Sequence, residues 1–406
     1  MAGNDRIVGI AVLAAFVIMA LAYTFYVGRP SSSGANAGKS SVTTSVGSTK
    51  IVVYGSQNST AQNAAASESG QTGSTTTSAV VAASYIPIVI RNSQPNATPL
   101  GFQEMIVVPS SNYSKYMADG WNNVEFSTLP GGKGEIVPAW IESNATSSSN
   151  ATVVWLKLPA PISPNNETTV YMDFMGFQTL SKNGPLGEAP QLSPLYAQYD
   201  NGGKIFNFYE NFAGTNLNSS MWTNDSAFSS NPIRVDDGLT IGRSTSNQDN
   251  GYGAVMSVRA FGQGVLDFYG TIAGNSTRPH YQDVGLVPAS ENNACNLIDV
   301  GSFYGPHQNG LEVVDSYCNA KYSAGLRFGS PAIYSIFVPS IDPASVTATV
   351  NYSDPLTIGF TSVTLPQTIG FENQGDVGNL GPIYWIRQRD YPPGGVMPSA
   401  SMGRPQ

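Results

Sequence analysis

The chain has 406 residues, of which only 11% are charged, and a formal net charge of −8 at pH 7. This acidic balance excludes a nucleic-acid-binding protein, because the phosphate backbone demands a basic surface. With two cysteines, two histidines and no C-x2-C or H-x3-H spacing, a zinc finger is excluded as well.

One uncharged apolar run, Ile7 to Val27, stands near the start of the chain. At about 1.5 Å per residue it is long enough to cross a hydrocarbon core of about 30 Å. We therefore predict an uncleaved membrane anchor within residues 1–30, with membrane lipid as its partner. Two alternatives stay open: signal-peptide cleavage near Ala22, which would release a secreted protein, and a packing helix of a filament subunit.

Residues 31–83 are expected to form a disordered stalk. Between positions 31 and 80, 21 of 50 residues are Ser or Thr, and such a segment lacks the apolar area that would offset its ordering entropy. The chain also holds ten N-x-S/T sequons, which favour a glycosylated body on the outer side of the cell membrane.

Strand-like runs begin at about Ser84 and predict a first β-sandwich over residues 84–178. The runs are short, β-branched or aromatic, and bounded by Pro, Gly, Asn and Ser. One of them, Tyr85 to Ile90, contains Pro87, and a proline of this kind is typical of an edge strand. The others are Met105–Val108, Val153–Leu158 and Thr169–Phe174.

A Pro- and Gly-rich stretch then leads to a second strand-rich region, residues 195–403. Its runs favour one large sandwich or jelly roll. They are Leu239–Ile241, Ala254–Val258, Val265–Tyr269, Leu311–Val314, Ile333–Val338 and Thr357–Phe360. Helical periodicity is nearly absent beyond the membrane segment, so the predicted fold class is all-β with two sandwich domains.

Several strings in the first region carry a family resemblance. They include Ile88-x-Ile90-x-Asn92-Ser93-Gln94, Trp140-Ile141-Glu142-Ser143 and Val154-Trp155-Leu156-Lys157-Leu158-Pro159. This region resembles the uncharacterised domain family numbered 2341, which occurs on exported archaeal and bacterial proteins. The resemblance implies an architecture and a location, and no reaction, because the family has no assigned activity.

The second region contains the strings Phe208-Tyr209-Glu210-Asn211-Phe212 and Asp236-Asp237-Gly238-Leu239-Thr240-Ile241. On these strings it resembles a concanavalin A-like or laminin G-like sandwich. The closing string Gly381-Pro382-Ile383-Tyr384-Trp385-Ile386-Arg387 is similar to the ends of archaeal surface proteins that combine the two domains. Such sandwiches often bind or cleave sugars, which is what the resemblance implies here.

Cys295 and Cys318 are the only cysteines and lie in the same region. An exported chain favours a disulfide between them, which the loop-entropy model values at about 3 kcal/mol. Two buried thiols are the alternative.

Catalytic patterns are weak. Sandwich glycoside hydrolases commonly take their carboxyls from one strand as E-x-D-x-x-E, a string that this chain lacks. The nearest pair, Glu312 and Asp315, would point to opposite faces of a regular strand. His280, Tyr281 and Asp283 form a polar cluster that could serve acid-base chemistry or ligand binding.

Alternation predicts a second ligand-lining set on two strands. On Val265–Ile272, Asp267 and Tyr269 should face away from the core, and on the last predicted strand Trp385, Arg387 and Arg389 should share a face. The alternative places Trp385 in the core and the two arginines at a sheet edge.

No cofactor follows from the sequence. Calcium is the metal ion worth considering, since Asn247-Gln248-Asp249-Asn250-Gly251 offers oxygen ligands, although it lacks a full spaced calcium loop. Together these patterns predict a membrane-anchored cell-surface protein that binds glycan or mediates adhesion through the distal sandwich. A structural protein that packs against neighbouring envelope proteins and a carbohydrate-active hydrolase are the alternatives.

Overall fold

The computed structural model describes residues 84–176, 184–224, 232–242, 255–273, 280–289, 295–303, 309–339, 345–359, 362–375 and 379–406. Within these ranges the fold is almost entirely β, as the sequence predicts, and no helix is both long enough and apolar enough to cross a membrane. The predicted anchor (7–27), the stalk (31–83) and the calcium candidate (247–251) lie outside the described residues.

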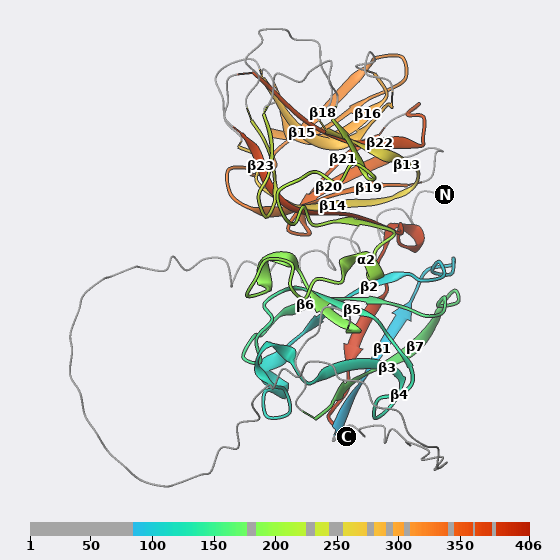
Figure 1. Ribbon diagram of the computed structural model, residues 1–406. Helices are drawn as coiled ribbons and strands as arrows, with labels where there is room; N and C mark the ends of the chain where they lie inside the picture. Colours follow the sequence, from blue (N-terminus) through green and yellow to red (C-terminus); the bar gives the residue numbers. More distant parts are fainter. Residues whose placement is uncertain are drawn as a thin grey trace, which may run out of the picture. The chain divides into compact units, whose positions relative to one another are not determined.

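Two sheets form the first sandwich (Figure 1). The five-stranded sheet has the order β24 (Ser399–Met402), β1 (Ser84–Asn92), β7 (Asn166–Phe174), β3 (Val124–Leu129) and β4 (Lys133–Ile136). The four-stranded sheet has the order β2 (Gln103–Val108), β6 (Thr152–Lys157), β5 (Ala139–Ser143) and β8 (Leu186–Glu188). Alternate residues of β1 and β6, such as Ile88 and Val154, meet in one buried core.

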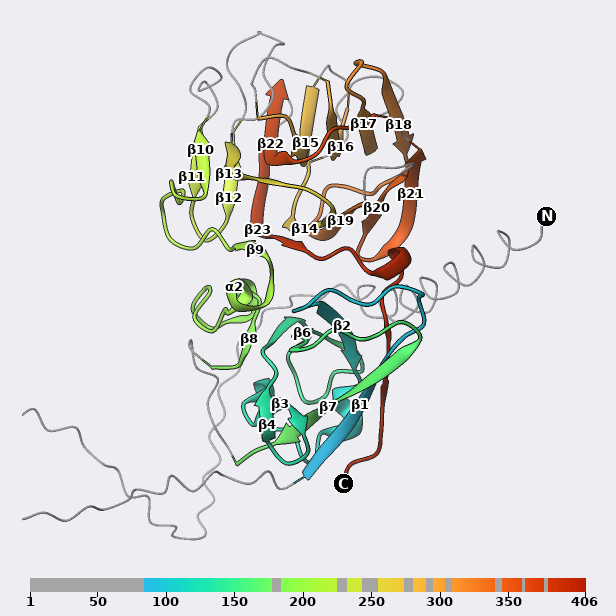
Figure 2. The same ribbon diagram turned by 90° about the vertical axis from the view of Figure 1, so that its right-hand side faces the viewer.

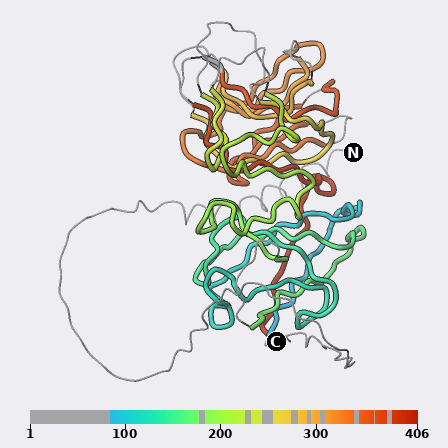
Figure 3. Tube along the Cα trace, viewed as in Figure 1, coloured from blue at the N-terminus to red at the C-terminus, as the bar shows by residue number. Residues whose placement is uncertain are grey.

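The expectation that the Pro87 strand is an edge strand is wrong. β1 lies between β7 and β24, because the end of the chain returns from the second sandwich and pairs antiparallel with β1 from Ile88 to Arg91. Figure 3 shows the red end of the tube running beside the blue first strand. The ring of Pro87 is tolerated because its carbonyl still accepts a hydrogen bond, from the Gly403 amide.

Two larger sheets form the second sandwich. The first, whose strands β22 to β18 lie side by side in Figure 2, has the order β10 (Trp222–Asn224), β13 (Val255–Phe261), β22 (Gln367–Gly375), β15 (His280–Val287), β16 (Leu297–Ser302), β17 (Asn309–Val314) and β18 (Ala320–Ala324). The second has the order β11 (Ile233–Val235), β12 (Leu239–Ile241), β23 (Leu380–Arg389), β14 (Gly264–Gly270), β19 (Ala332–Val338), β20 (Ser345–Val350) and β21 (Ser353–Gly359). A short strand, β9 (Phe208–Glu210), also pairs with β23.

The core of the second sandwich comes from strict alternation on both sheets. Val284 and Leu286 of β15 and Phe268 of β14 are among its buried members. Every second residue of these strands therefore points away from the core, and those outer faces carry the polar chemistry described below.

The domain boundaries differ from those expected from sequence. β8 lies in the stretch taken as a linker but pairs in parallel with β5, and β24 lies within 195–403 but completes a sheet of the first sandwich. The described helices are single turns: η1 (Ser110–Tyr113), η2 (Asp119–Trp121), η3 (Pro190–Leu192), α2 (Gly202–Ile205) and η5 (Pro393–Gly395). The chain therefore passes from the first sandwich to the second after β8 and returns to the first sandwich with β24.

Candidate functional site

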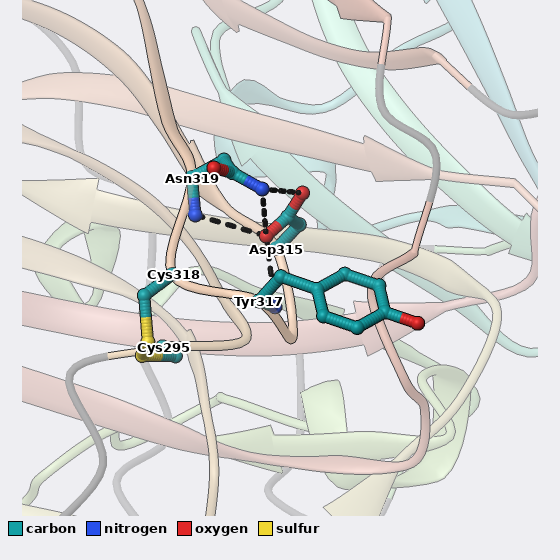
Figure 4. The surroundings of a disulfide bond; sticks show 5 residues. All are labelled: Cys295, Asp315, Tyr317, Cys318 and Asn319. Atoms are coloured by element: carbon teal, nitrogen blue, oxygen red, sulfur yellow. Dashed lines mark hydrogen bonds between the residues drawn. A yellow bond between two sulfur atoms is a disulfide. The ribbon is translucent and has the colours of Figure 1, made fainter.

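The predicted disulfide is confirmed and closes a rigid turn. Cys295 precedes β16, Cys318 lies between β17 and β18, and their Cα atoms are 4.6 Å apart. Figure 4 shows the Asp315 carboxylate accepting hydrogen bonds from the Tyr317 and Asn319 amides and from the Asn319 side chain. These hydrogen bonds to Asn319 hold the pKa of Asp315 below its ordinary value. Asp315 is thus a turn residue beyond the end of β17 and does not pair with Glu312 on one strand.

The predicted set on β14 and β23 is brought together, but in the interior. Asp267 lies directly opposite Arg387, and Tyr269 lies opposite Trp385, so these side chains share a face as expected. That face does not point to solvent: Asp267, Trp385 and Arg387 are 0% exposed. The outward orientation expected from sequence is corrected, because this side of the eight-stranded sheet contacts the four-stranded sheet of the first sandwich through aromatic residues.

Arg387 is the centre of this interior cluster. Its guanidinium donates to Asp267 at 2.8 Å, to Glu142 of β5 at 2.8 Å and to the Tyr352 hydroxyl at 2.7 Å. Arg389 also donates to Asp267 at 2.8 Å. Burial alone would raise the pKa of Asp267, but the two guanidiniums outweigh it and hold that pKa below its ordinary value.

Four rings surround the same guanidinium, those of Trp140, Trp155, Phe206 and Trp385, with centroids between 4.3 and 5.2 Å from it. Because the described polar partners are other protein groups and the aromatic faces are covered, this cluster joins the two sandwiches and presents no described surface to a ligand.

The other predicted residues lie on β15, in the seven-stranded sheet. Tyr281 is half-buried, and Asp283 is buried on the sheet face opposite the core. His280 begins the strand, opposite Gly375 in register, and its side chain lies outside the described ones. Asp283 proves to be one of four acidic residues on neighbouring strands of this face.

The same two-residue pattern occurs on each of these four strands: an acid and a glycine separated by one core residue. It reads Asp283-x-Gly285 on β15, Asp299-x-Gly301 on β16, Gly310-x-Glu312 on β17 and Gly370-x-Glu372 on β22. We call the four acids and four glycines the acid–glycine face. The intervening residues Val284, Val300, Leu311 and Phe371 all belong to the core, which places the eight on the opposite side.

Strand register arranges the acid–glycine face as two offset pairs. Glu372 lies opposite Asp283, and Asp299 lies opposite Glu312. The second pair is offset from the first by two residues, since Asp299 lies opposite Gly285. The glycines are also opposite one another, Gly370 with Gly285 and Gly301 with Gly310. Cβ atoms of opposite residues lie about 4.5–5.5 Å apart, so each carboxyl has a second carboxyl beside it and bare backbone next to both.

The glycines are required by close approach. A Cβ atom on Gly301 would lie 2.5 Å from the Cβ of Asp283, and one on Gly285 would lie 2.6 Å from that of Asp299. A larger residue at Gly285 or Gly301 would therefore displace these carboxyls, whereas a Cβ atom on Gly370 would lie 2.6 Å from the side chain of Val287, which covers that glycine.

All four carboxyls are buried, with 2–6% of each residue exposed. Burial raises the pKa of Asp283, Asp299, Glu312 and Glu372, and carboxyl neighbours add to this for all but Glu312. The pKa of Glu312 is raised to about 7, although a hydrogen bond with Tyr322 opposes the rise. Asp299 Oδ1 and Glu372 Oε2 have no hydrogen-bond partner among the described residues.

Aromatic and apolar side chains border the acid–glycine face. On one side Phe303 stacks edge-on against Tyr322, with centroids 5.9 Å apart, and contacts Tyr281 at 6.4 Å. Tyr281 and Tyr322 are half-buried, so this border reaches solvent. On the other side lies a small apolar cluster, Met256, Val287, Cys295, Leu297 and Val314.

The arrangement can accept hydrogen bonds, donate a proton from a neutral carboxyl and stack an apolar ring face on tyrosine. Within the described ranges no three Asp, Glu, His or Cys side chains converge as metal ligands would. Sequence reasoning found Asp283 and Glu312 but missed Asp299 and Glu372. The signal that could have found them is the recurrence of an acid two positions from a glycine on four strand-like runs.

Comparison with known proteins places the chain in no family, since no protein-family model matches it. The resemblance of the first sandwich to family 2341 therefore stays a prediction. The chain is similar to an uncharacterised protein, protein 562, of Sulfolobus islandicus rod-shaped virus 1, with 36% identity over 125 residues. That match covers 30% of this chain and spans only about a fifth (21%) of the viral protein.

Solved structures with some similarity include a β-glucanase from Bacillus licheniformis and an endo-β-galactosidase from Clostridium perfringens that releases GlcNAcα1-4Gal. The first is 14% identical with a TM-score of 0.33, and covers 45% of this chain and 97% of that one. The second is 11% identical with a TM-score of 0.36, and covers 45% of this chain and 62% of that one.

Proposed function

We propose that the second sandwich binds a glycan on the acid–glycine face. The observation that carries the proposal is the pairing of buried carboxyls with bare glycine backbone on four adjacent strands. Buried carboxyl oxygens without partners are costly in a protein interior, and sugar hydroxyls are donors that would satisfy Asp299 and Glu372. Tyr281 and Tyr322 offer ring faces at the partly exposed border, where a sugar ring can stack.

The remaining parts of the chain fit a cell-surface protein. The disulfide is typical of an oxidising compartment, and the apolar run 7–27 would hold the body at the membrane with residues 31–83 as a stalk. We infer a single-pass membrane protein whose sandwiches lie outside the cell. Protease digestion of intact cells tests this: the sandwiches should be cleaved from the surface, whereas protection until the membrane is permeabilised would contradict it.

Glycan binding is tested with the full chain on an array of envelope and plant glycans, followed by titration of each hit. Asp299→Asn and Glu312→Gln should weaken binding at least about tenfold, or about 1.4 kcal/mol, because each removes an acceptor of charge-assisted hydrogen bonds. Glu135→Gln on β4 is the matched control, since Glu135 is exposed. Equal affinity of all variants, or no glycan bound, would refute the proposal.

Hydrolysis of the bound glycan is a second candidate, favoured by the two opposed carboxyl pairs. In glycoside hydrolysis one carboxyl protonates the leaving oxygen while a second, ionised carboxylate attacks the sugar or activates water. Opposite residues such as Asp299 and Glu312 have Cβ atoms about 4.5–5.5 Å apart. The raised pKa of both suits the proton donor, so hydrolysis also requires that the bound sugar ionise one of the two. Product analysis of every glycan that binds decides this: released reducing ends that disappear in Glu312→Gln support hydrolysis, and unchanged glycan rejects it.

A further inference from the structure

The charge on the acid–glycine face carries the proposed function one step further. Four carboxyls share one face, and the described groups that act on them are other carboxyls and the Tyr322 hydroxyl. No lysine or arginine is among the described groups that shift the pKa of these four carboxyls. Arg387 and Arg389 lie in the interior cluster, Lys321 donates to the Gly359 carbonyl, and Arg259 donates to the Asn207 carbonyl.

Two of these acids also have a buried oxygen for which the described residues offer no hydrogen-bond partner. Asp299 Oδ1 and Glu372 Oε2 lack partners while their residues are 98% and 95% buried. Asp283 lies between Glu372 on one side and Gly301 on the other, so its neighbours offer it no cation either. A buried carboxylate needs a paired cation or a shared proton.

Resting on the proposed function, we propose that the glycan recognised by the acid–glycine face carries free amino groups, as in a de-N-acetylated hexosamine chain. An ammonium group placed over the Gly301–Gly310 pair would meet carboxyls from neighbouring strands, among them Asp299 and Glu312, and supply the missing cation and donors at once. The acetylated form is neutral and bulkier, and it cannot ion-pair. A uronic acid chain would bring a further negative charge and is excluded by repulsion.

The tyrosine border sets the geometry of the complex. Tyr322 donates to Glu312 and contacts Phe303, so its ring is held in place next to the carboxyl pair of β16 and β17. A sugar ring stacked at this border would direct its ring substituents toward Glu312 and Asp299. The inferred ligand is therefore a short oligosaccharide whose amino group, and not its ring, enters the space above the glycines.

The test is a series of β-1,4-linked tetrasaccharides that differ only at the second ring carbon: hydroxyl (cellotetraose), acetamido (chitotetraose) and free amine (its de-acetylated form). Titration of the full chain in mild detergent at mildly acidic pH should give the amine form at least about tenfold tighter binding than either neutral form, because close charge pairs couple strongly. Tetragalacturonate should not bind.

Proton release is the second readout. Binding of an ammonium favours the ionised carboxylates, so the amine form should release protons, measured as a dependence of the binding heat on buffer ionisation. Asp299→Asn combined with Glu372→Gln should abolish both the preference and the proton release, while Glu135→Gln keeps both. Circular dichroism of the double variant verifies its fold, and single variants replace it if the fold is lost.

The outcomes separate the two proposals. Tight, proton-releasing binding of the amine form supports the inference. Binding of the neutral tetrasaccharides at equal affinity keeps glycan binding and overturns the amine preference. Binding of no saccharide overturns both proposals. Both are also overturned if Ca²⁺ alone saturates the acid–glycine face and a chelator removes it.

Discussion

Replacement of Arg387 by methionine should produce a large loss of stability. The guanidinium is 0% exposed and bridges the first sandwich, through Glu142, to the second, through Asp267 and Tyr352. Methionine fills much of the same volume but leaves Glu142 buried without its cation. Breaking a buried ion pair from one side costs about 3–5 kcal/mol.

The aromatic cage adds to this cost. Four rings lie within 5.2 Å of the guanidinium carbon, and a desolvated cation–π contact contributes about 1–2 kcal/mol. These contributions overlap, so we expect a total loss of about 4–6 kcal/mol, a large fraction of the ~5–15 kcal/mol of a typical domain. Arg387→Lys should have a stability between those of the natural protein and Arg387→Met, because lysine keeps the positive charge but lacks the planar guanidinium.

The assay is denaturant unfolding followed by tryptophan fluorescence, which is well suited because Trp140, Trp155 and Trp385 line the cage. Since Arg387 joins the sandwiches, we expect one unfolding transition for the natural protein and two separate transitions for the variant. Arg234→Met is the control: its ion pair with Asp236 is exposed and should contribute no more than about 1 kcal/mol. A loss below about 1 kcal/mol in Arg387→Met would refute the reasoning.

Three further predictions concern stability. Cys318→Ser should lower the unfolding free energy by about 3 kcal/mol, since the disulfide closes a loop with a sequence separation of 23, and an unchanged melting temperature under reducing conditions would contradict it. Glu104→Gln should stabilise the protein above neutral pH and leave its stability unchanged in acid, because both Glu104 oxygens lack described partners and burial raises the pKa of Glu104 despite the Arg389 charge. Urea titrations at two pH values measure this, and a lower unfolding free energy of the variant at high pH would argue against it. The pKa of Glu312 is raised to about 7, so the folded protein holds a proton that the unfolded chain releases above about 4.5. The contribution of this proton to the unfolding free energy should be fully present below pH 4.5 and be lost as pH rises through 7. Glu312→Gln should flatten this part of the melting-temperature profile, and an identical slope in both proteins would count against the assignment.

Strand positions and the disulfide could be predicted from local patterns. Leu239–Ile241 coincides with β12, and Val265–Tyr269 lies within β14, because apolar alternation and flanking glycines depend only on neighbouring residues. The shared faces of Asp267 with Tyr269 and of Trp385 with Arg387 followed from the same period of two. Cys295 and Cys318 formed the only pair available for a disulfide.

What covers a face was decided by tertiary structure alone. Alternation separates the two sides of β14 but cannot say that a second sandwich buries the polar side, so Asp267 and Arg387 were expected at a surface and lie in the interior. In the same way, Pro87 was expected on an edge strand because the pairing of β1 with β24 joins residues about 310 positions apart. The four acids of the acid–glycine face are likewise separated in sequence, and only the order and register of β22, β15, β16 and β17 bring them side by side. Local sequence encodes which residues point to the same side of a strand, whereas contacts distant in sequence determine what lies on that side.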